Sequence, residues 1–491
     1  MNKHFFTFIS KFILLLFALC VSYYSLYSQY NSLYNYEDLS HIYYLKQKDS
    51  IKKNWTCPDL YKIKERQKKY KEIWDSRTDF ITSAFETKDY VYEKELFAYL
   101  QTIIDEIVAG NQSLIPTKPT LLLDRSSAAN AYAIGGNVLA VNLGLITFAR
   151  YREDLAMVIA HELGHNILNH AENAMKDKAE WLTSDDYKQS LNSILNSKYE
   201  RLSRLKKVFE SYSFNRNKHQ RYKEGDADSL AIELLKNTKI PFNASFFLKL
   251  DSSDIQYKQP LSKPFKTYFA KYDVPFEESW LLKKSKGLST RVYNFKDTTS
   301  IEDSLKTHPD CKDRYAKSLK YSSINQIYTP IPTKLKEKAN KMLIWNLFDN
   351  EALTACLYRI LIEKDSGNKD EWYDFMVYNI FSGLYYADKE LNRFNAIGIT
   401  PKEYISKDYY ELQNMFEQLP REILADYCKK MSESSFWHAL PGDTRAFKSF
   451  FYALNFKLEA SSKSNEMAAK EFETSNSKSM YREFSDHFKK K

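Results

Sequence analysis

One helical segment restricts the fold of this chain more than any other part of it. Between residues 155 and 168 the polar side chains are those of His161, Glu162, His165 and Asn166. On an α-helix these four share an arc of about 140°, and the rest of the circumference is apolar. Such a helix must be buried, and buried imidazoles and carboxylates are costly unless they are bonded to a partner. The segment therefore predicts a packed core around a polar site.

The spacing of the two histidines suits a metal ion. Residues 161–165 read His-Glu-Leu-Gly-His. Positions four apart on an α-helix differ by about 40° in azimuth, so His161 and His165 project toward one ion. One zinc ion per chain would be the partner that these buried groups need. A chance match on an ordinary core helix is the alternative, and it should arise on the order of once per hundred such sequences.

The rest of this segment offers no further ligand. His170 comes nine residues after His161, which is the opposite side of a continuous helix, so we expect it to be structural. A pattern with a third histidine on the same segment would need glycine at 168 and histidine at 171, where the chain has Leu168 and Ala171. A third ligand must therefore come from elsewhere if zinc is to keep one open position.

The sequence EGDAD at residues 224–228 offers that ligand at the start of a second predicted helix. Glu224 and Asp228 are one turn apart and share a face, whereas Asp226 and Glu233 point the other way. We expect Glu224 to bind the metal and Asp228 to orient a ligating imidazole. A capped helix start with solvated acids is the alternative.

Short β-like runs precede the histidine helix. An amphipathic helix is predicted at 90–108, then strands at 120–123, 131–134 and 138–142, with Gly135-Gly136 as a hairpin turn. Helices are predicted at 153–173 and 185–212 after them. The strand at 138–142 could pair with an extended polypeptide by strand addition. Its residues, the candidate substrate-binding set, are Val138, Leu139, Ala140, Val141 and Asn142.

Several motifs together resemble a known family. HELGH followed by EGDAD, an ExxAD pattern, is similar to the zinc peptidase family that includes the CAAX prenyl proteases and the HtpX heat-shock proteases. Residues 130–145 are similar to the family's NAxA…GG…VxxGL segment, and Thr307-His308-Pro309 with Arg314 resembles its THPxxxxR motif. The resemblance covers about residues 90–319 and implies a zincin-like metallopeptidase domain.

The resemblance also implies a catalytic role for each of these residues. Zinc held by His161, His165 and Glu224 would lower the pKa of a water molecule and polarise the scissile carbonyl, while Glu162 would carry the proton to the leaving amine.

The later motif implies two more functional residues. His308 would approach or transiently ligate the zinc, and Arg314 would steady the site or the developing oxyanion. A loop His-Pro and a surface arginine are the alternative.

The first 28 residues have the anatomy of a signal peptide. Lys3 and Lys11 precede an apolar run from Phe12 to Val21 and then a polar stretch. The run is shorter than the roughly 20 residues of a membrane span, and an uncleaved anchor is the alternative. No later window is apolar enough to cross a bilayer. We therefore expect an exported, periplasmic or secreted protein without a membrane span in its mature chain.

Composition excludes some other functions. The formal charge is +9, but the basic residues are dispersed among acids, so we expect no nucleic-acid partner. Four cysteines follow the leader without a CxxC pair, which excludes a zinc ribbon and leaves both disulfides and free thiols open. They are Cys57, Cys311, Cys356 and Cys428.

The predicted fold class is α+β, mainly α, with a small sheet in the metallopeptidase domain and an all-helical C-terminal region. Beyond residue 321 the pattern is helical and aromatic, with helices at 335–348, 351–363 and 370–387, and a repeat is suggested without a fixed period. The predicted parts are a signal peptide (1–28), an N-terminal helical extension (29–85), the metallopeptidase domain (86–325) and the helical C-terminal domain (326–491).

These features predict a zinc endopeptidase for unfolded or flexible exported proteins. Such an enzyme would serve quality control in the envelope, and it looks more like the soluble periplasmic branch, typified by the barrel-assembly-enhancing protease, than the membrane-embedded members. The alternative is a catalytically silent zinc-bound scaffold or chaperone-like protein that acts through its C-terminal helices, where a protein partner would bind.

Overall fold

The computed structural model describes residues 36–37, 42–87, 89–197, 200–250, 257–282, 311–322, 326–435, 442–458, 463–477 and 479–488, with backbone alone for 36–37, 42–45 and 206–222. The expected signal peptide, residues 1–28, lies outside them. The chain divides into two compact units. Of the described residues, those between 36 and 250 and between 311 and 343 form one, the sheet unit, and those at 257–282 and between 344 and 488 form the other, the helical unit.

The sheet unit is built on a mixed sheet with the strand order β1-β2-β3-β5-β4. β3 and β5 are parallel, and the other neighbours are antiparallel. All five residues of β5 are buried, as expected for a strand with a neighbour on each side. β4 is the edge strand next to the histidine helix. The strands are β1 (Tyr36–Glu37), β2 (Tyr90–Glu93), β3 (Thr120–Asp124), β4 (Ala131–Gly135) and β5 (Val138–Asn142).

The three predicted strands and the glycine turn are confirmed. Gly135 and Gly136 have φ angles of 93° and 60°, a region that favours glycine, and they lead from β4 into β5. The helix predicted from residue 90 begins four residues later, because Tyr90–Glu93 pairs with β3 as β2.

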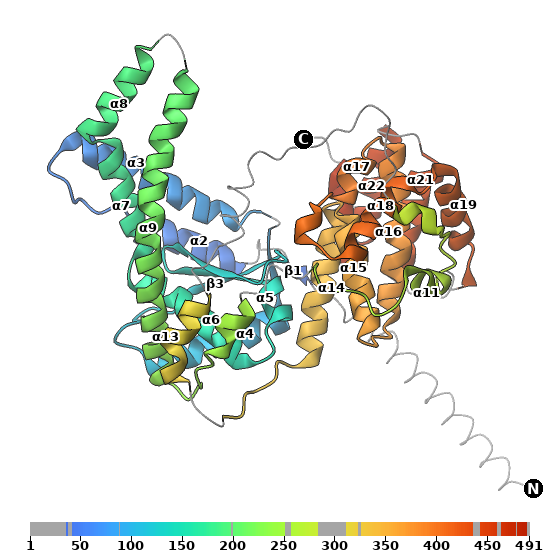
Figure 1. Ribbon diagram of the computed structural model, residues 1–491, viewed down its shortest axis with the longest axis horizontal. Helices are drawn as coiled ribbons and strands as arrows, with labels where there is room; N and C mark the ends of the chain where they lie inside the picture. Colours follow the sequence, from blue (N-terminus) through green and yellow to red (C-terminus); the bar gives the residue numbers. More distant parts are fainter. Residues whose placement is uncertain are drawn as a thin grey trace, which may run out of the picture. The chain divides into compact units, whose positions relative to one another are not determined.

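Helices surround this sheet. In chain order they are α2 (Ile42–Asn54), α3 (Lys64–Ala84), α4 (Lys94–Gly110), α5 (Leu143–Phe148), α6 (Arg152–Ile167), α7 (His170–Leu182), α8 (Asp185–Leu195), α9 (Arg201–Lys236), α10 (Ser245–Leu250), α13 (Cys311–Ser318), the 3-10 turn η3 (Leu319–Tyr321) and α14 (Thr333–Asp349), which continues past residue 343 into the helical unit. Figure 1 shows α8 and α9 running side by side as an arm that extends away from the sheet.

The start of α4 is fixed by a buried charge. The Glu93 carboxylate accepts a hydrogen bond of 2.8 Å from the Leu96 amide, which satisfies one free N–H of the first helical turn. The Lys338 ammonium donates to the other oxygen of Glu93 at 2.7 Å, and both side chains are buried. The pair ties α14 to the β2–α4 junction.

α6 and α9 pack closely because small residues meet at their crossing. A Cβ atom on Gly164 would lie 3.1 Å from the carbonyl oxygen of Ala227. Ala227 is fully buried. The glycine of HELGH and the alanine of EGDAD therefore let two helix backbones approach, and the functional side chains beside them come into contact range.

Two helix boundaries differ from the prediction. The helix expected at 153–173 ends at Ile167, because Asn169 adopts a left-handed conformation with φ of 52°, and α7 starts anew at His170. The helix expected to begin near residue 224 is the last third of α9, so Glu224 lies inside a helix and not at a capped start. The predicted helix at 185–212 is divided between α8 and α9.

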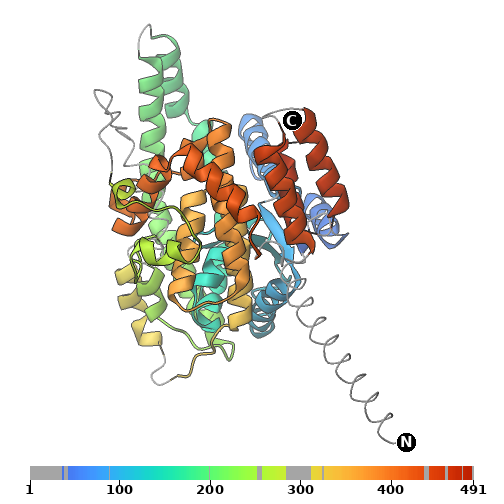
Figure 2. The same ribbon diagram turned by 90° about the vertical axis from the view of Figure 1, so that its right-hand side faces the viewer.

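The helical unit contains two short helices from residues 257–282 and the helices that follow residue 350. They are α11 (Phe265–Ala270), η2 (Glu278–Leu281), α15 (Leu353–Asp365), α16 (Glu371–Lys389), α17 (Arg393–Ile397), η4 (Lys402–Tyr404), α18 (Lys407–Gln418), α19 (Arg421–Ser432), α21 (Gly442–Phe456), α22 (Lys463–Ser475) and η5 (Met480–Phe488). Figure 2 shows those from α15 onward in orange and red. Aromatic rings fill their core: the Phe447 ring lies 5.6 Å from that of Trp345 and 5.2 Å from that of Tyr481.

The predicted fold class, α+β with mainly α content, is confirmed. The four described cysteines are free thiols. None of the described helices has the length and apolarity that a bilayer-spanning helix needs. The partner expected at the C-terminal helices stays a prediction.

Candidate active site

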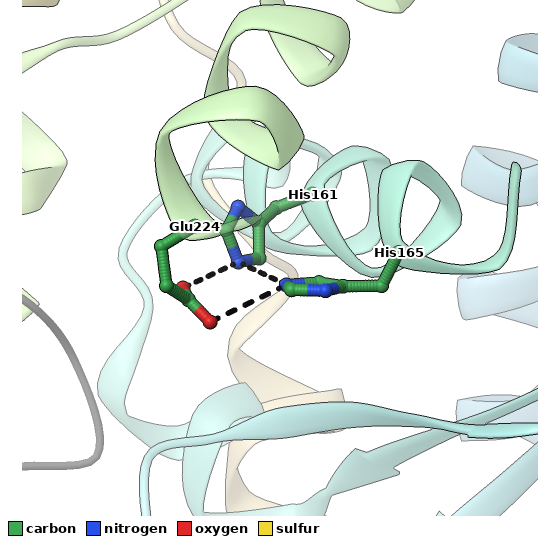
Figure 3. A group of neighbouring side chains, drawn as sticks. All are labelled: His161, His165 and Glu224. Atoms are coloured by element: carbon green, nitrogen blue, oxygen red, sulfur yellow. Dashed lines mark hydrogen bonds and ion pairs between the residues drawn. The ribbon is translucent and has the colours of Figure 1, made fainter. Parts of the chain in front are cut away.

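Three side chains with metal-binding atoms meet where α6 crosses α9 (Figure 3). His161 Nε2 lies 3.3 Å from Glu224 Oε2, and His165 Nε2 lies 3.6 Å from Glu224 Oε1. The two Nε2 atoms are 3.0 Å apart. One ligand atom from each residue lies within 4.8 Å of the others. The structure thus brings together the three residues that the sequence predicts as ligands.

The charge states of this trio suit a cation. Burial alone would raise the pKa of Glu224, but the imidazoles beside it lower it, so the group is held as a carboxylate. Burial, followed by the charge of His161, lowers the pKa of His165 to about 4. Burial opposes a charge on His161, yet Asp228 and Glu224 together raise its pKa to about 9. The two carboxylates therefore favour a positive charge at this place.

His161 is held from behind by an acid. Its Nδ1 atom lies 2.9 Å from Asp228 Oδ1. Arg314 on α13 donates to both oxygens of Asp228, at 2.7 Å from Nε and 2.6 Å from Nη2. The guanidinium also lies 4.4 Å from the ring centroid of Phe247. Burial would raise the pKa of Asp228, but His161 and Arg314 lower it to about 2, so a partly buried, charged carboxylate orients His161.

His165 has an orienting partner that sequence reasoning misses. Its Nδ1 lies 2.7 Å from Nδ1 of His170. The left-handed turn at Asn169 ends α6 and brings His170 back toward α6, whereas a continuous helix would carry it away. His170 is outside the metal-binding trio, as predicted, but the geometric reason given for that was wrong.

Glu162 lies beside the trio, and its two carboxylate oxygens have different neighbours. Its Oε1 atom is 4.0 Å from His161 Nε2, and Oε2 accepts a hydrogen bond of 2.9 Å from the Ala133 amide of β4. The side chain is 7% exposed. Burial raises its pKa to about 7, against the lowering effect of His161. A carboxyl group that titrates near neutrality can both accept and release a proton.

The prediction that Val138, Leu139, Ala140, Val141 and Asn142 bind the substrate is wrong. These residues form β5, which pairs with β3 on one side and with β4 on the other. Their backbone donors and acceptors are used within the sheet, so no strand can be added there. Of the two strands of this hairpin, β4 has the outer edge, and it is β4 that contacts Glu162.

A large cleft runs along this edge. Its volume is about 1190 Å³, and it is lined by Asn130, Ala131, Tyr132 and Ala133 at the β4 edge, by the trio and Glu162, and by side chains of α3 and α7. A smaller, mostly apolar cavity also reaches His161 and Glu162. Its lining includes Met157, Val158, Ala231, Phe242, Phe247 and Leu250.

The two residues predicted from the THPxxxxR motif have different outcomes. His308 lies outside the described residues. Arg314 is buried and contacts the site through Asp228, so it is not the surface arginine of the alternative interpretation.

The family model for peptidase family M48 matches residues 94–322. This part of the chain belongs to peptidase family M48. The activity of M48 members in general is zinc-dependent proteolysis, which supports a metallopeptidase and implies polypeptide substrates. No curated protein matches the chain. The resemblance to a particular M48 branch stays a prediction.

The trio fits the zinc ion of an M48 peptidase. Two imidazole nitrogens and one carboxylate are a known ligand set for catalytic zinc, with a fourth position open. Glu224 Oε2 is buried without a hydrogen-bond partner among the described residues, which is costly unless the atom binds something. His161, His165 and Glu224 would hold the ion.

Proposed function

We propose that the chain is a zinc-dependent endopeptidase that hydrolyses unfolded or flexible polypeptides. The observation that carries the proposal is the meeting of His161, His165 and Glu224 next to the buried carboxylate of Glu162. The cleft supports a polypeptide substrate, since its volume of about 1190 Å³ lies above the roughly 300–1,000 Å³ typical of small-molecule pockets.

Glu162 performs the proton transfers. Zinc, when bound, lowers the pKa of a water molecule and polarises the scissile carbonyl. Oε1 of Glu162, which faces the trio, takes the proton of the attacking water and later delivers it to the leaving amine. The Ala133 amide holds the other oxygen in place. A pKa of about 7 allows both steps near neutral pH.

The substrate pairs with β4. An edge strand presents unpaired N–H and C=O groups, and an extended chain can bind to them with little dependence on its side chains. Asn130–Ala133 line the cleft beside Glu162, so a chain bound there passes the reacting groups.

The protein works after export. Support comes from residues 1–28, where two lysines precede a short apolar run. Cell fractionation with amino-terminal sequencing of the purified protein tests this. A protein that starts at Met1 and stays in the cytoplasm would overturn it.

Glu162→Gln tests the catalytic proposal. We expect the variant to keep zinc and fold and to lose cleavage of unfolded casein by roughly 10²- to 10⁴-fold, because the carboxylate that moves the proton is gone. Glu233→Gln, an exposed position on α9, is the matched control and should cleave normally. Unchanged client handling by Glu162→Gln in the absence of cleavage would favour the zinc-bound scaffold, and equal cleavage by the variant and the parent protein would overturn the role of Glu162.

A further inference from the structure

The outer edge of β4 is closed at one end. Arg77 on α3 donates a hydrogen bond of 2.9 Å from Nε to the carbonyl oxygen of Ile134. The cleft reaches Asn130, Ala131, Tyr132 and Ala133, and Ile134 is not part of its lining. The first backbone acceptor after Ala133 is therefore occupied by a side chain of the same protein.

Packing reinforces this closure. Ile81, Ala84 and Phe85, at the end of α3, share a hydrophobic cluster with Ile134. The indole of Trp55, just after α2, covers the turn that follows β4: a Cβ atom on Gly135 would lie 3.1 Å from it. An added strand cannot continue past Ala133 without displacing these groups.

The closure lies next to the reacting groups. Ala133, the last residue of the edge before the closure, has its amide bound to Glu162, so its carbonyl oxygen is the group left for pairing there. A chain on the β4 edge can pair between Ala131 and the carbonyl of Ala133 on one side of the scissile bond, because both backbone groups of Asn130 are bonded to Ala128 and Asn142. The other side meets Arg77. Beyond that point the cleft walls are side chains of α3 and α7, among them Ile73, Phe80, Met175 and Trp181.

We propose that Arg77 of α3 ends strand pairing at Ala133, so that substrates bind as a β-strand on one side of the scissile bond and through side chains on the other. Residues 42–85, which precede the part matched by the M48 family model, would then be a specificity element of the cleft. The proposal rests on the proposed function, because it concerns the substrate of that site.

The proposal predicts that kcat/KM depends on peptide length differently on the two sides of the scissile bond. Peptides of alanine, serine and threonine around one cleavable bond are lengthened by one residue at a time on either side. In the parent protein kcat/KM should rise about fivefold per added backbone hydrogen bond on one side, and level off after the first residue on the other. Arg77→Ala should restore a rise of about fivefold on that second side.

Two further variants separate the contributions. Arg77→Met keeps most of the side-chain volume and loses the donor, so it tests the hydrogen bond alone and should give a smaller gain in the same direction. Lys71→Ala removes a fully exposed charge from the same helix and should leave the length profile unchanged. Equal gains on both sides in the parent protein, or the same profile in Arg77→Ala as in the parent, would overturn the proposal.

Binding measurements keep this test separate from that of the proposed function. The same peptides, labelled and with a non-hydrolysable bond, are titrated by fluorescence anisotropy. If affinity rises with peptide length on one side of the central bond only, and no cleavable peptide is cleaved, the role of Arg77 is supported and the peptidase is refuted. If peptides are cleaved but affinity rises equally with length on both sides, the peptidase is supported and the role of Arg77 is refuted. Peptides that neither bind nor are cleaved would overturn both.

Discussion

Arg314 holds Asp228 through two hydrogen bonds of 2.7 and 2.6 Å, and the carboxylate so held lies 2.9 Å from Nδ1 of His161. Arginine, acid and imidazole form a chain from α13 through α9 to α6. Because Arg314 uses Nε and Nη2 on Asp228, its contact with the metal trio is indirect. We infer that Arg314 is a positioning residue, which corresponds to the first of the two roles that the family motif implies for it.

Asp228→Asn should weaken metal binding by about 10- to 100-fold, since the acid that orients His161 loses its charge. Competition for zinc with a chelator of known affinity measures this. Asp226→Asn, on the exposed side of the same helix, is the matched control and should bind zinc normally. Unchanged zinc affinity in Asp228→Asn would show that this chain of contacts does not support the metal.

His170→Phe should weaken zinc binding by about tenfold, because His165 then lacks a partner for Nδ1 and its ring orientation is no longer fixed. Asn169→Gly serves as control: glycine adopts the left-handed φ of 52° readily, so the turn and the zinc affinity should persist. A His170→Phe protein that binds zinc as tightly as the parent would assign His170 a packing role only.

The stability of the helical unit should depend on pH through His487. A hydrogen bond with Asp349, at 3.1 Å, raises the pKa of His487 despite the opposing effect of burial. A raised folded-state pKa stabilises the fold below the usual value of about 6.5, and the contribution is lost as pH rises through the raised value.

His487→Gln should therefore lower the free energy of unfolding at pH 6 by a few tenths to about 1 kcal/mol, as expected for a partly exposed pair. The difference from the parent protein should vanish by pH 9. Urea denaturation at both pH values measures it. A difference that is equal at the two pH values, or larger at pH 9, would contradict the assignment.

The metal trio could be predicted from the sequence because each of its three residues belongs to a short motif. His161 and His165 follow from the helical period, and Glu224 from a short motif. Even the wrong start of the second helix does no harm, since Glu224 and Asp228 are one turn apart in either case.

Strand order, by contrast, depends on distant pairing. The β4–β5 hairpin is visible in the sequence, but the partner that buries β5 is β3, with Thr120 opposite Val138. One signal was available: residues 138–141 read Val-Leu-Ala-Val, an uninterrupted apolar run that is typical of a central strand.

His170 could not be placed by periodicity because the period is broken. The left-handed turn at Asn169 restarts the helix, and asparagine is a residue type that tolerates this conformation. The contact of Arg77 with Ile134 joins residues far apart in the chain, so it has no sequence signature.

Anomalous diffraction at the zinc edge, from crystals of the zinc-loaded protein, tests most directly that one ion is shared by two helices. We predict a single strong peak between His161 Nε2, His165 Nε2 and the Glu224 carboxylate, which disappears in Glu224→Ala. A peak elsewhere, or one that is undiminished in Glu224→Ala, would contradict the assignment of these three residues as the metal site.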